Sequence, residues 1–129
     1  MIGFARDRSI GIQCMNWYQI EFESGFHNVE RILLADEVMK SPGIPEKNEL
    51  VKAIRAKGIP VMSEIEFGYR YKGNAKIAAI TGSNGKTTTT SLLFHICQVA
   101  EKDAAMVGNI GFSFARQIAQ DPKELYVIE

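Results

Sequence analysis

Residues 76–90 constrain the fold of this chain more than any other stretch, because they join an apolar run to a glycine turn and a threonine-rich segment. Residues 77–80 predict a buried β-strand, and the residues from Thr87 onward predict a helix. Between them, Gly82 and Gly85 allow backbone N–H groups to turn toward an anion, and the N-terminus of a helix attracts negative charge. The stretch is therefore predicted to form a strand, a phosphate-binding loop and a helix.

The same turn supplies the charged and hydroxyl groups that a nucleoside triphosphate site needs. Lys86 can pair with phosphate oxygens, and Thr87 can offer an oxygen to Mg²⁺. The general motif has a glycine where this chain has Ile80, and the nearest glycine is Gly82. A plain glycine turn with a lysine nearby is the alternative. Because Gly-Lys-Thr-Thr at a strand-to-helix junction is hard to obtain from turn chemistry alone, we predict a nucleotide site.

The segments after this loop predict a parallel α/β fold. Strands are expected at 104–107 and 125–128, with a helix at 112–120 between them. Strands that alternate with helices imply parallel β-α-β units with right-handed crossovers. The first helix carries apolar residues at spacings of three and four, which predicts one stripe facing a core: Leu92, Leu93, Ile96, Val99 and Ala100. His95 and Cys97 are interpreted as packing or surface positions rather than ligands.

Three features fall at the carboxyl ends of the predicted strands, where parallel sheets bind ligands. They are the loop at 82–87, the turn at 108–111 and Glu129. A carboxylate at a strand end near a phosphate loop is suited to organise Mg²⁺. A frayed terminal residue is an equally good interpretation of Glu129 from its position alone.

The first half of the chain carries weaker signals. Residues 1–18 show no periodicity and are treated as an unassigned leader, while 19–70 are predicted to be the back part of a Rossmann-like domain and 71–129 the start of an ATPase domain. Within 19–70, strands are expected at 19–22, 37–40 and 59–62, and helices at 46–57 and 63–71. The proline- and glycine-rich run at 41–45 interrupts these elements.

Composition narrows the class of protein. The 129 residues contain 15 Lys and Arg against 15 Asp and Glu, so no general attraction to nucleic acid or anionic lipid is expected. Cys14 and Cys97 have no metal-type spacing and suggest no disulfide framework. No stretch approaches the roughly 20 apolar residues of a membrane span, and arginines interrupt the N-terminal apolar residues of a possible signal peptide. The cytoplasm is the expected compartment.

Taken together, the motifs resemble those of the Mur ligase family, the ATP-dependent amide-forming enzymes of peptidoglycan synthesis. Residues 80–88 resemble the ATP-binding signature of this family, which also lacks the first glycine of the general motif. Four shorter motifs, in this order and spacing, are most similar to members that add D-glutamate: 41–45, 63–67, 108–111 and 126–129.

The resemblance implies a reaction and a set of site residues. ATP would phosphorylate the carboxylate of UDP-N-acetylmuramoyl-L-alanine, and the amine of D-glutamate would attack the acyl phosphate. Lys86 and Glu129 would be catalytic, Thr87 and Glu129 would hold Mg²⁺, and Asn109, Ser41 and Gly43 would contact the nucleotide-sugar substrate. For Ser41 and Gly43 a proline-rich turn explains the residues equally well. The ATP phosphates would be held by Gly82, Ser83, Asn84, Gly85, Lys86, Thr87 and Thr88.

The chain also departs from the family pattern. It lacks the N-terminal glycine-rich turn of the UDP-binding domain, and it stops at Glu129, before the family's second-metal histidine, carbamylated lysine and D-glutamate-binding domain. We therefore expect an incomplete fragment that is inactive alone and self-associates. The alternatives are a sibling Mur or folylpolyglutamate-type ligase, which motifs 41–45 and 63–67 disfavour, a stand-alone nucleotide-binding module, and an inert translation product.

Overall fold

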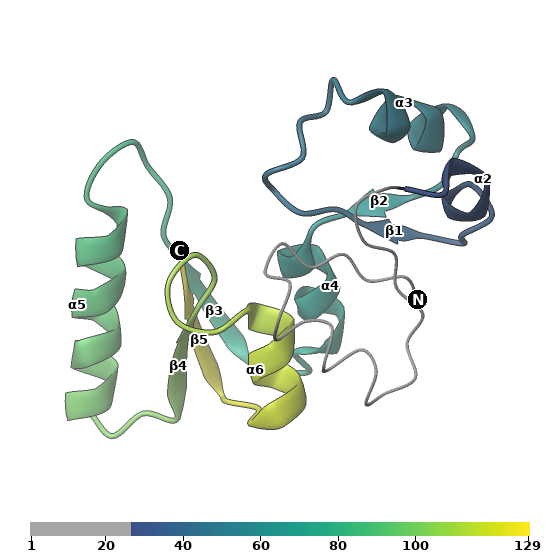
Figure 1. Ribbon diagram of the computed structural model, residues 1–129. Helices are drawn as coiled ribbons and strands as arrows, with labels where there is room; N and C mark the ends of the chain where they lie inside the picture. Colours follow the sequence, from purple (N-terminus) through teal and green to yellow (C-terminus); the bar gives the residue numbers. More distant parts are fainter. Residues whose placement is uncertain (1–26) are drawn as a thin grey trace. The chain divides into compact units, whose positions relative to one another are not determined.

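The computed structural model describes residues 27–129, which fall into two compact units (Figure 1). The described part of the first unit is 27–38 with 46–60, and that of the second is 39–45 with 61–129. The leader predicted at 1–18 and the strand predicted at 19–22 lie outside the described residues. The domain boundary expected after residue 70 remains a prediction, and the unit that holds the glycine-rich loop also takes in 61–70.

The first unit holds two short helices with asparagine caps. Helix α2 (Val29–Ile32) begins after Asn28, whose side chain accepts a hydrogen bond from the N–H of Arg31. Helix α3 (Glu49–Ala56) begins later than predicted because Asn48 caps it, accepting from the N–H of Leu50. Buried residues of the two helices are Ile32, Val51 and Ile54.

Strands β1 (Val38–Met39) and β2 (Val61–Met62) form a two-stranded sheet. The predicted strands at 37–40 and 59–62 are thus confirmed, although only two residues of each satisfy the strand geometry. The N–H of Val38 donates to the carbonyl of Pro60 at 2.9 Å.

The second unit contains a three-stranded parallel sheet with strand order β3-β5-β4. The strands are β3 (Lys76–Ala79), β4 (Ala104–Val107) and β5 (Leu125–Ile128). Helix α5 (Lys86–Val99) connects β3 to β4, and helix α6 (Phe114–Gln120) connects β4 to β5. The predicted parallel α/β class is therefore confirmed, and β5 is central because it pairs with both other strands.

Helices lie on both faces of this sheet, with α5 on one side and α6 on the other (Figure 1). Helix α4 (Glu64–Tyr71) packs on α6. The core beneath α6 is built around Phe114 and Tyr126, which are fully buried and meet edge to face with ring centroids 4.9 Å apart. Ala105 and Val107 of β4 and Ile128 of β5 complete this cluster.

The buried face of α5 differs from the predicted one. Leu92, Ile96 and Val99 are exposed at 58%, 53% and 71%, whereas Thr90 and Cys97 are buried. Thr90 can be buried because its hydroxyl donates a hydrogen bond to the carbonyl of Lys86 at 2.8 Å. The stripe prediction was wrong because apolar residues occur on more than one face of this helix, so periodicity could not choose between them.

None of the helices within residues 27–129 has both the length and the apolar character needed to span a membrane.

Candidate functional site

The glycine-rich loop leaves the carboxyl end of β3 and enters α5. The N–H of Ile80 donates to the carbonyl of Ile128 at 2.8 Å, which fixes the start of the loop to the central strand. Gly85 ends the loop with φ +74°, a left-handed conformation that is strained for other residues. The predicted sequence of strand, glycine turn and helix is therefore present, and α5 begins at Lys86.

The N-terminus of α5 differs from those of the other described helices. Side chains cap α2, α3, α4 and α6, each accepting a hydrogen bond from a first-turn N–H, and these caps are Asn28, Asn48, Ser63 and Ser113. Gly85 provides no such side chain. Within residues 27–129, the backbone N–H groups of 83–88 donate no hydrogen bond to the protein. Because most of this loop is exposed, these donors are open to an anion.

Lys86 lies over the same loop. Its Nζ donates to the carbonyl oxygen of Gly82 at 2.8 Å, so the ammonium group is held at the first glycine of the loop. Ser83, Thr87 and Thr88 are exposed residues with hydroxyl side chains. The loop thus combines a fixed cation, helix N–H groups and hydroxyls, which is the chemistry of a phosphate site.

The turn after β4 is hydrogen-bonded to the end of β5. The N–H of Asn109 donates to the carbonyl of Glu129 at 3.3 Å, and the N–H of Glu129 donates to the carbonyl of Val107 at 3.2 Å. The turn closes on itself because the N–H of Gly108 donates to the carbonyl of Phe112 at 3.0 Å. The structure therefore brings the predicted residues Asn109 and Glu129 together, with the Asn109 side chain exposed.

The Glu129 carboxylate has the character expected of a cation ligand. Its Oε2 atom is buried and has no hydrogen-bond partner among the described residues. A buried, unsatisfied carboxylate oxygen is costly unless a cation or donor faces it. No group of three or more His, Cys, Asp or Glu that could hold a metal lies within 27–129. The residues nevertheless fit Mg²⁺, which takes one or two protein carboxylates and completes its shell with phosphates and waters.

Ser41 and Gly43 lie together in the loop after β1. The N–H of Ile44 donates to the carbonyl of Ser41 at 3.0 Å, and a Cβ atom at position 43 would lie 3.9 Å from Ser41 Oγ. Both residues belong to the second unit, as do the glycine-rich loop and Glu129. No hydrogen bond joins either of them to residues 82–129 in the described part of the chain.

Helix α4 reaches the N-terminus of α6 through Glu64. Its Oε1 accepts a hydrogen bond from the N–H of Ala115 at 2.5 Å. The two helices approach closely because residue 68 is glycine: a Cβ atom there would lie 2.7 Å from Cδ1 of Phe114. Sequence reasoning gave Glu64 no role. The Ser63 cap of α4 was detectable from its spacing to Glu66, but a contact across 51 residues left no local signal.

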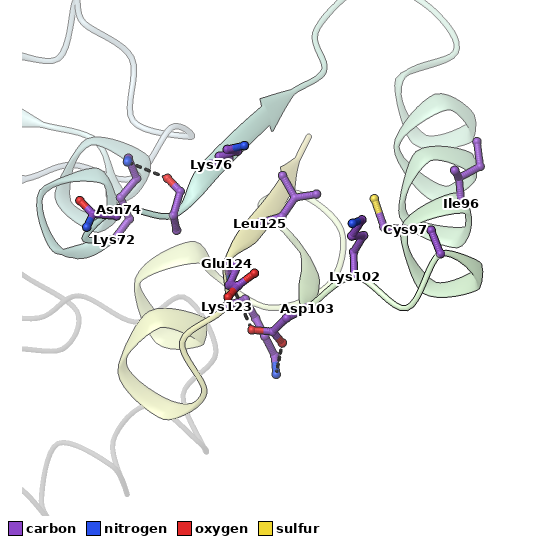
Figure 2. A pocket seen from close by; sticks show the side chains of 12 residues that line it. Lys72, Asn74, Lys76, Ile96, Cys97, Lys102, Asp103, Lys123, Glu124 and Leu125 are labelled. Atoms are coloured by element: carbon purple, nitrogen blue, oxygen red, sulfur yellow. Dashed lines mark hydrogen bonds and ion pairs between the residues drawn. The ribbon is translucent and has the colours of Figure 1, made fainter.

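A cavity of about 790 Å³ lies at the other end of the strands, near their amino ends (Figure 2). Lys76 and Leu125, at the amino ends of β3 and β5, line it together with Ile96 and Cys97 of α5. The glycine-rich loop, the 108–111 turn and Glu129 all follow the carboxyl ends of the strands. The cavity is therefore separate from the candidate site.

Comparisons with known proteins agree with this arrangement. Residues 80–127 match the family model described as the Mur ligase middle domain. The chain is 52% identical over 112 residues to the UDP-N-acetylmuramoylalanine–D-glutamate ligase of Bacteroides thetaiotaomicron, covering 87% of this chain and 25% of the relative. The ligases of the same name from Cytophaga hutchinsonii and Bacillus thuringiensis are 54% identical over 111 residues and 45% identical over 91 residues. These two matches cover 85% and 70% of this chain.

The chain spans about a quarter of the length of these curated relatives. The match to the family model begins at Ile80, directly after β3, and covers the glycine-rich loop, α5, β4, α6 and most of β5. The family model and the relatives therefore give the same result, and this chain belongs to the Mur ligase family.

Proposed function

We propose that the second unit of this chain contributes a Mg·ATP site to a ligase that joins D-glutamate to UDP-N-acetylmuramoyl-L-alanine. The observation that carries the proposal is the loop at 82–88, where Lys86 is held at the Gly82 carbonyl and the N–H groups of 83–88 donate no hydrogen bond within residues 27–129. The identity to ligases of that name supports the choice of substrates. Because the chain spans a quarter of those relatives, the role proposed for its own residues is binding and orientation.

In this proposal the loop binds the phosphates of ATP. The N–H groups of 83–88 donate to phosphate oxygens, and Lys86 exchanges its contact with the Gly82 carbonyl for one with a phosphate. Thr87 and Glu129 would hold Mg²⁺, which neutralises charge on the phosphoryl group that is transferred. Glu129 is suited to this role because its Oε2 is buried and lacks a partner among the described residues.

The proposed reaction forms an amide bond in two steps. The substrate carboxylate takes the γ-phosphoryl group of ATP, which leaves ADP and an acyl phosphate. The amine of D-glutamate attacks the acyl carbon, phosphate leaves, and the ammonium loses its proton. A free carboxylate resists an amine, so the phosphoryl transfer supplies the leaving group. Asn109, held beside Glu129, is proposed to contact the muramoyl substrate. Ser41 and Gly43 are proposed to line the uridine-nucleotide site.

The test is a titration of Mg·ATP into the isotopically labelled 129-residue chain, followed by its backbone amide spectrum. The expected result is a shift of the resonances of 82–88. Lys86→Ala should weaken the affinity at least tenfold, since a charge-assisted contact is lost. Lys102→Ala, which removes an exposed lysine at the opposite edge of the sheet, is the matched control and should bind as the parent does. Equal affinities for the parent and Lys86→Ala would refute the assignment of the loop.

A further inference from the structure

The first turn of α6 receives its hydrogen-bond acceptors from two different parts of the chain. Ser113 Oγ accepts from the N–H of Arg116 at 3.3 Å, as a local cap. Glu64 Oε1 accepts from the N–H of Ala115 at 2.5 Å and comes from α4, a helix 51 residues earlier. A carboxylate at a helix N-terminus is favoured by both the hydrogen bond and the helix dipole. The position of α6 is therefore tied to α4 at this point.

The packing of α4 against α6 reinforces this tie. Gly68 lies one turn after Glu64 and is buried against the ring of Phe114, the first residue of α6. Phe114 is itself fully buried and stacks edge to face with Tyr126 of the central strand. Because this ring lies in the core, its contact with Tyr126 holds the N-terminus of α6 against β5.

The N-terminus of α6 also fixes the position of the turn at 108–112, which carries Asn109. Only Ser113 separates Phe114 from Phe112, whose carbonyl accepts from the N–H of Gly108 at 3.0 Å. Asn109 then donates to the carbonyl of Glu129. A continuous series of contacts thus runs from the Glu64 carboxylate, through the start of α6, to the two residues at the carboxyl edge of the sheet.

From this series we infer that Glu64 is a positioning residue, which fixes Asn109 beside Glu129 by holding the N-terminus of α6. The inference rests on the proposed function only in assigning Asn109 and Glu129 to the ligand site. Glu64 does not itself touch a ligand in this scheme. It acts through the backbone of the turn at 108–112.

Amide hydrogen exchange of the ligand-free 129-residue chain tests the inference. Glu64→Leu removes the acceptor and the charge, and Glu64→Gln keeps an acceptor of similar shape. In Glu64→Leu, exchange at the amides of Asn109 and Ala115 should be about tenfold faster, the effect of losing one charge-assisted hydrogen bond. Glu64→Gln should restore most of the protection and leave a rise of about threefold, because its neutral acceptor makes a weaker hydrogen bond.

Glu66 provides the matched controls, because it is also acidic, lies in the same first turn of α4 and is exposed. Glu66→Leu and Glu66→Gln should leave the amide of Asn109 at the parental rate. The amide of Ile80, which bonds to β5 at the other side of the sheet, serves as an internal reference. Equal acceleration at Ile80 and Asn109 in Glu64→Leu would mean general destabilisation and would overturn the inference. If Glu64→Leu does not fold, the inference is tested with Glu64→Gln alone. Exchange at the Asn109 amide of Glu64→Gln at the parental rate would then overturn the inference.

The Mg·ATP titration separates this inference from the proposed function. Local acceleration in the Glu64 variants, without any Mg·ATP binding by the parent chain, would support the positioning role and refute the nucleotide site. Binding of Mg·ATP without local acceleration would refute the positioning role alone.

Discussion

Gly108 lies so close to Glu129 that a Cβ atom at position 108 would come within 2.5 Å of the Glu129 carbonyl oxygen. The glycine also has φ +108°, a conformation that side chains rarely adopt. The turn after β4 and the end of β5 therefore share one tightly packed contact, and any side chain at 108 must push Glu129 away.

Gly108→Ala should lower the free energy of unfolding by about 2–4 kcal/mol, the sum of backbone strain and steric overlap. Urea unfolding of the two proteins measures this difference. Gly73→Ala is the control, because Gly73 also has a positive φ, +60°, but no atom lies within 4 Å of its hypothetical Cβ. It should cost only the strain, about 1 kcal/mol. Equal losses at the two positions would mean that the contact with Glu129 contributes nothing.

Glu129→Gln should abolish most of the contribution of Mg²⁺ to ATP affinity. The amide keeps the shape of the side chain but loses the charge that the buried Oε2 would present to a cation. We expect ATP affinity measured with Mg²⁺ to fall about tenfold, while affinity measured with a chelator stays the same. Calorimetric titration gives both values. Glu124→Gln, at an exposed residue of the opposite edge, should behave as the parent, and an undiminished Mg²⁺ effect in Glu129→Gln would contradict the metal assignment.

Lys123 should make stability depend on pH at the alkaline end. Its ammonium lies 3.0 Å from Asp121 and 3.1 Å from Asp103 (Figure 2 shows the contact with Asp103), and hydrogen bonds to these carboxylates, Asp121 first, raise the pKa of Lys123 above its usual 10.5. A raised folded-state pKa gives stability that is complete below pH 10.5 and is lost as the pH rises through the folded-state value. Thermal melts from neutral pH to beyond 10.5 should show a steeper decline for the parent than for Lys123→Met. Lys102→Met should decline as steeply as the parent, and parallel curves for the parent and Lys123→Met would exclude the ion pairs as the cause.

The exposed apolar residues of α5 should make the chain associate with itself. Leu92 and Ile96 lie on one side of the helix and are more than half exposed. Sedimentation should give a mean mass that rises with concentration for the parent and stays near that of one chain for Leu92→Glu with Ile96→Glu. The control Ser91→Glu with Gln98→Glu adds the same charge at exposed polar positions of the same helix. If the control dissociates as completely as Leu92→Glu with Ile96→Glu, the added charge and not the loss of apolar surface causes the dissociation.

The sequence predicted the helices and strands well where neighbouring residues and the rules of parallel sheets determine them. Gly85 had to end a loop, and the alternation of strands and helices after it required parallel pairing, as observed for β3, β4 and β5. The position of Glu129 at the carboxyl edge followed from the same topology. These features depend on neighbours in sequence and on the rules of parallel sheets.

The remaining features depend on contacts between distant segments. Which face of α5 is buried depends on the sheet it covers, and Thr90 reached the core only because its hydroxyl bonds within its own helix. The role of Glu64 depends on a helix 51 residues later, and the burial of Glu129 Oε2 depends on packing at the strand end. No spacing in the sequence encodes these relations, so the pattern alone could not give them.

Because no side chain caps α5, binding of an anion in the glycine-rich loop would stabilise the start of this helix. A bound anion would do for this helix what Asn28, Asn48, Ser63 and Ser113 do for the others. Whatever binds only the folded loop then adds its binding free energy to the stability of the chain, about 2.7 kcal/mol at a concentration of one hundred times Kd. The melting temperature would therefore follow the ligand concentration, and the ligand would be part of what keeps the first turn of α5 wound.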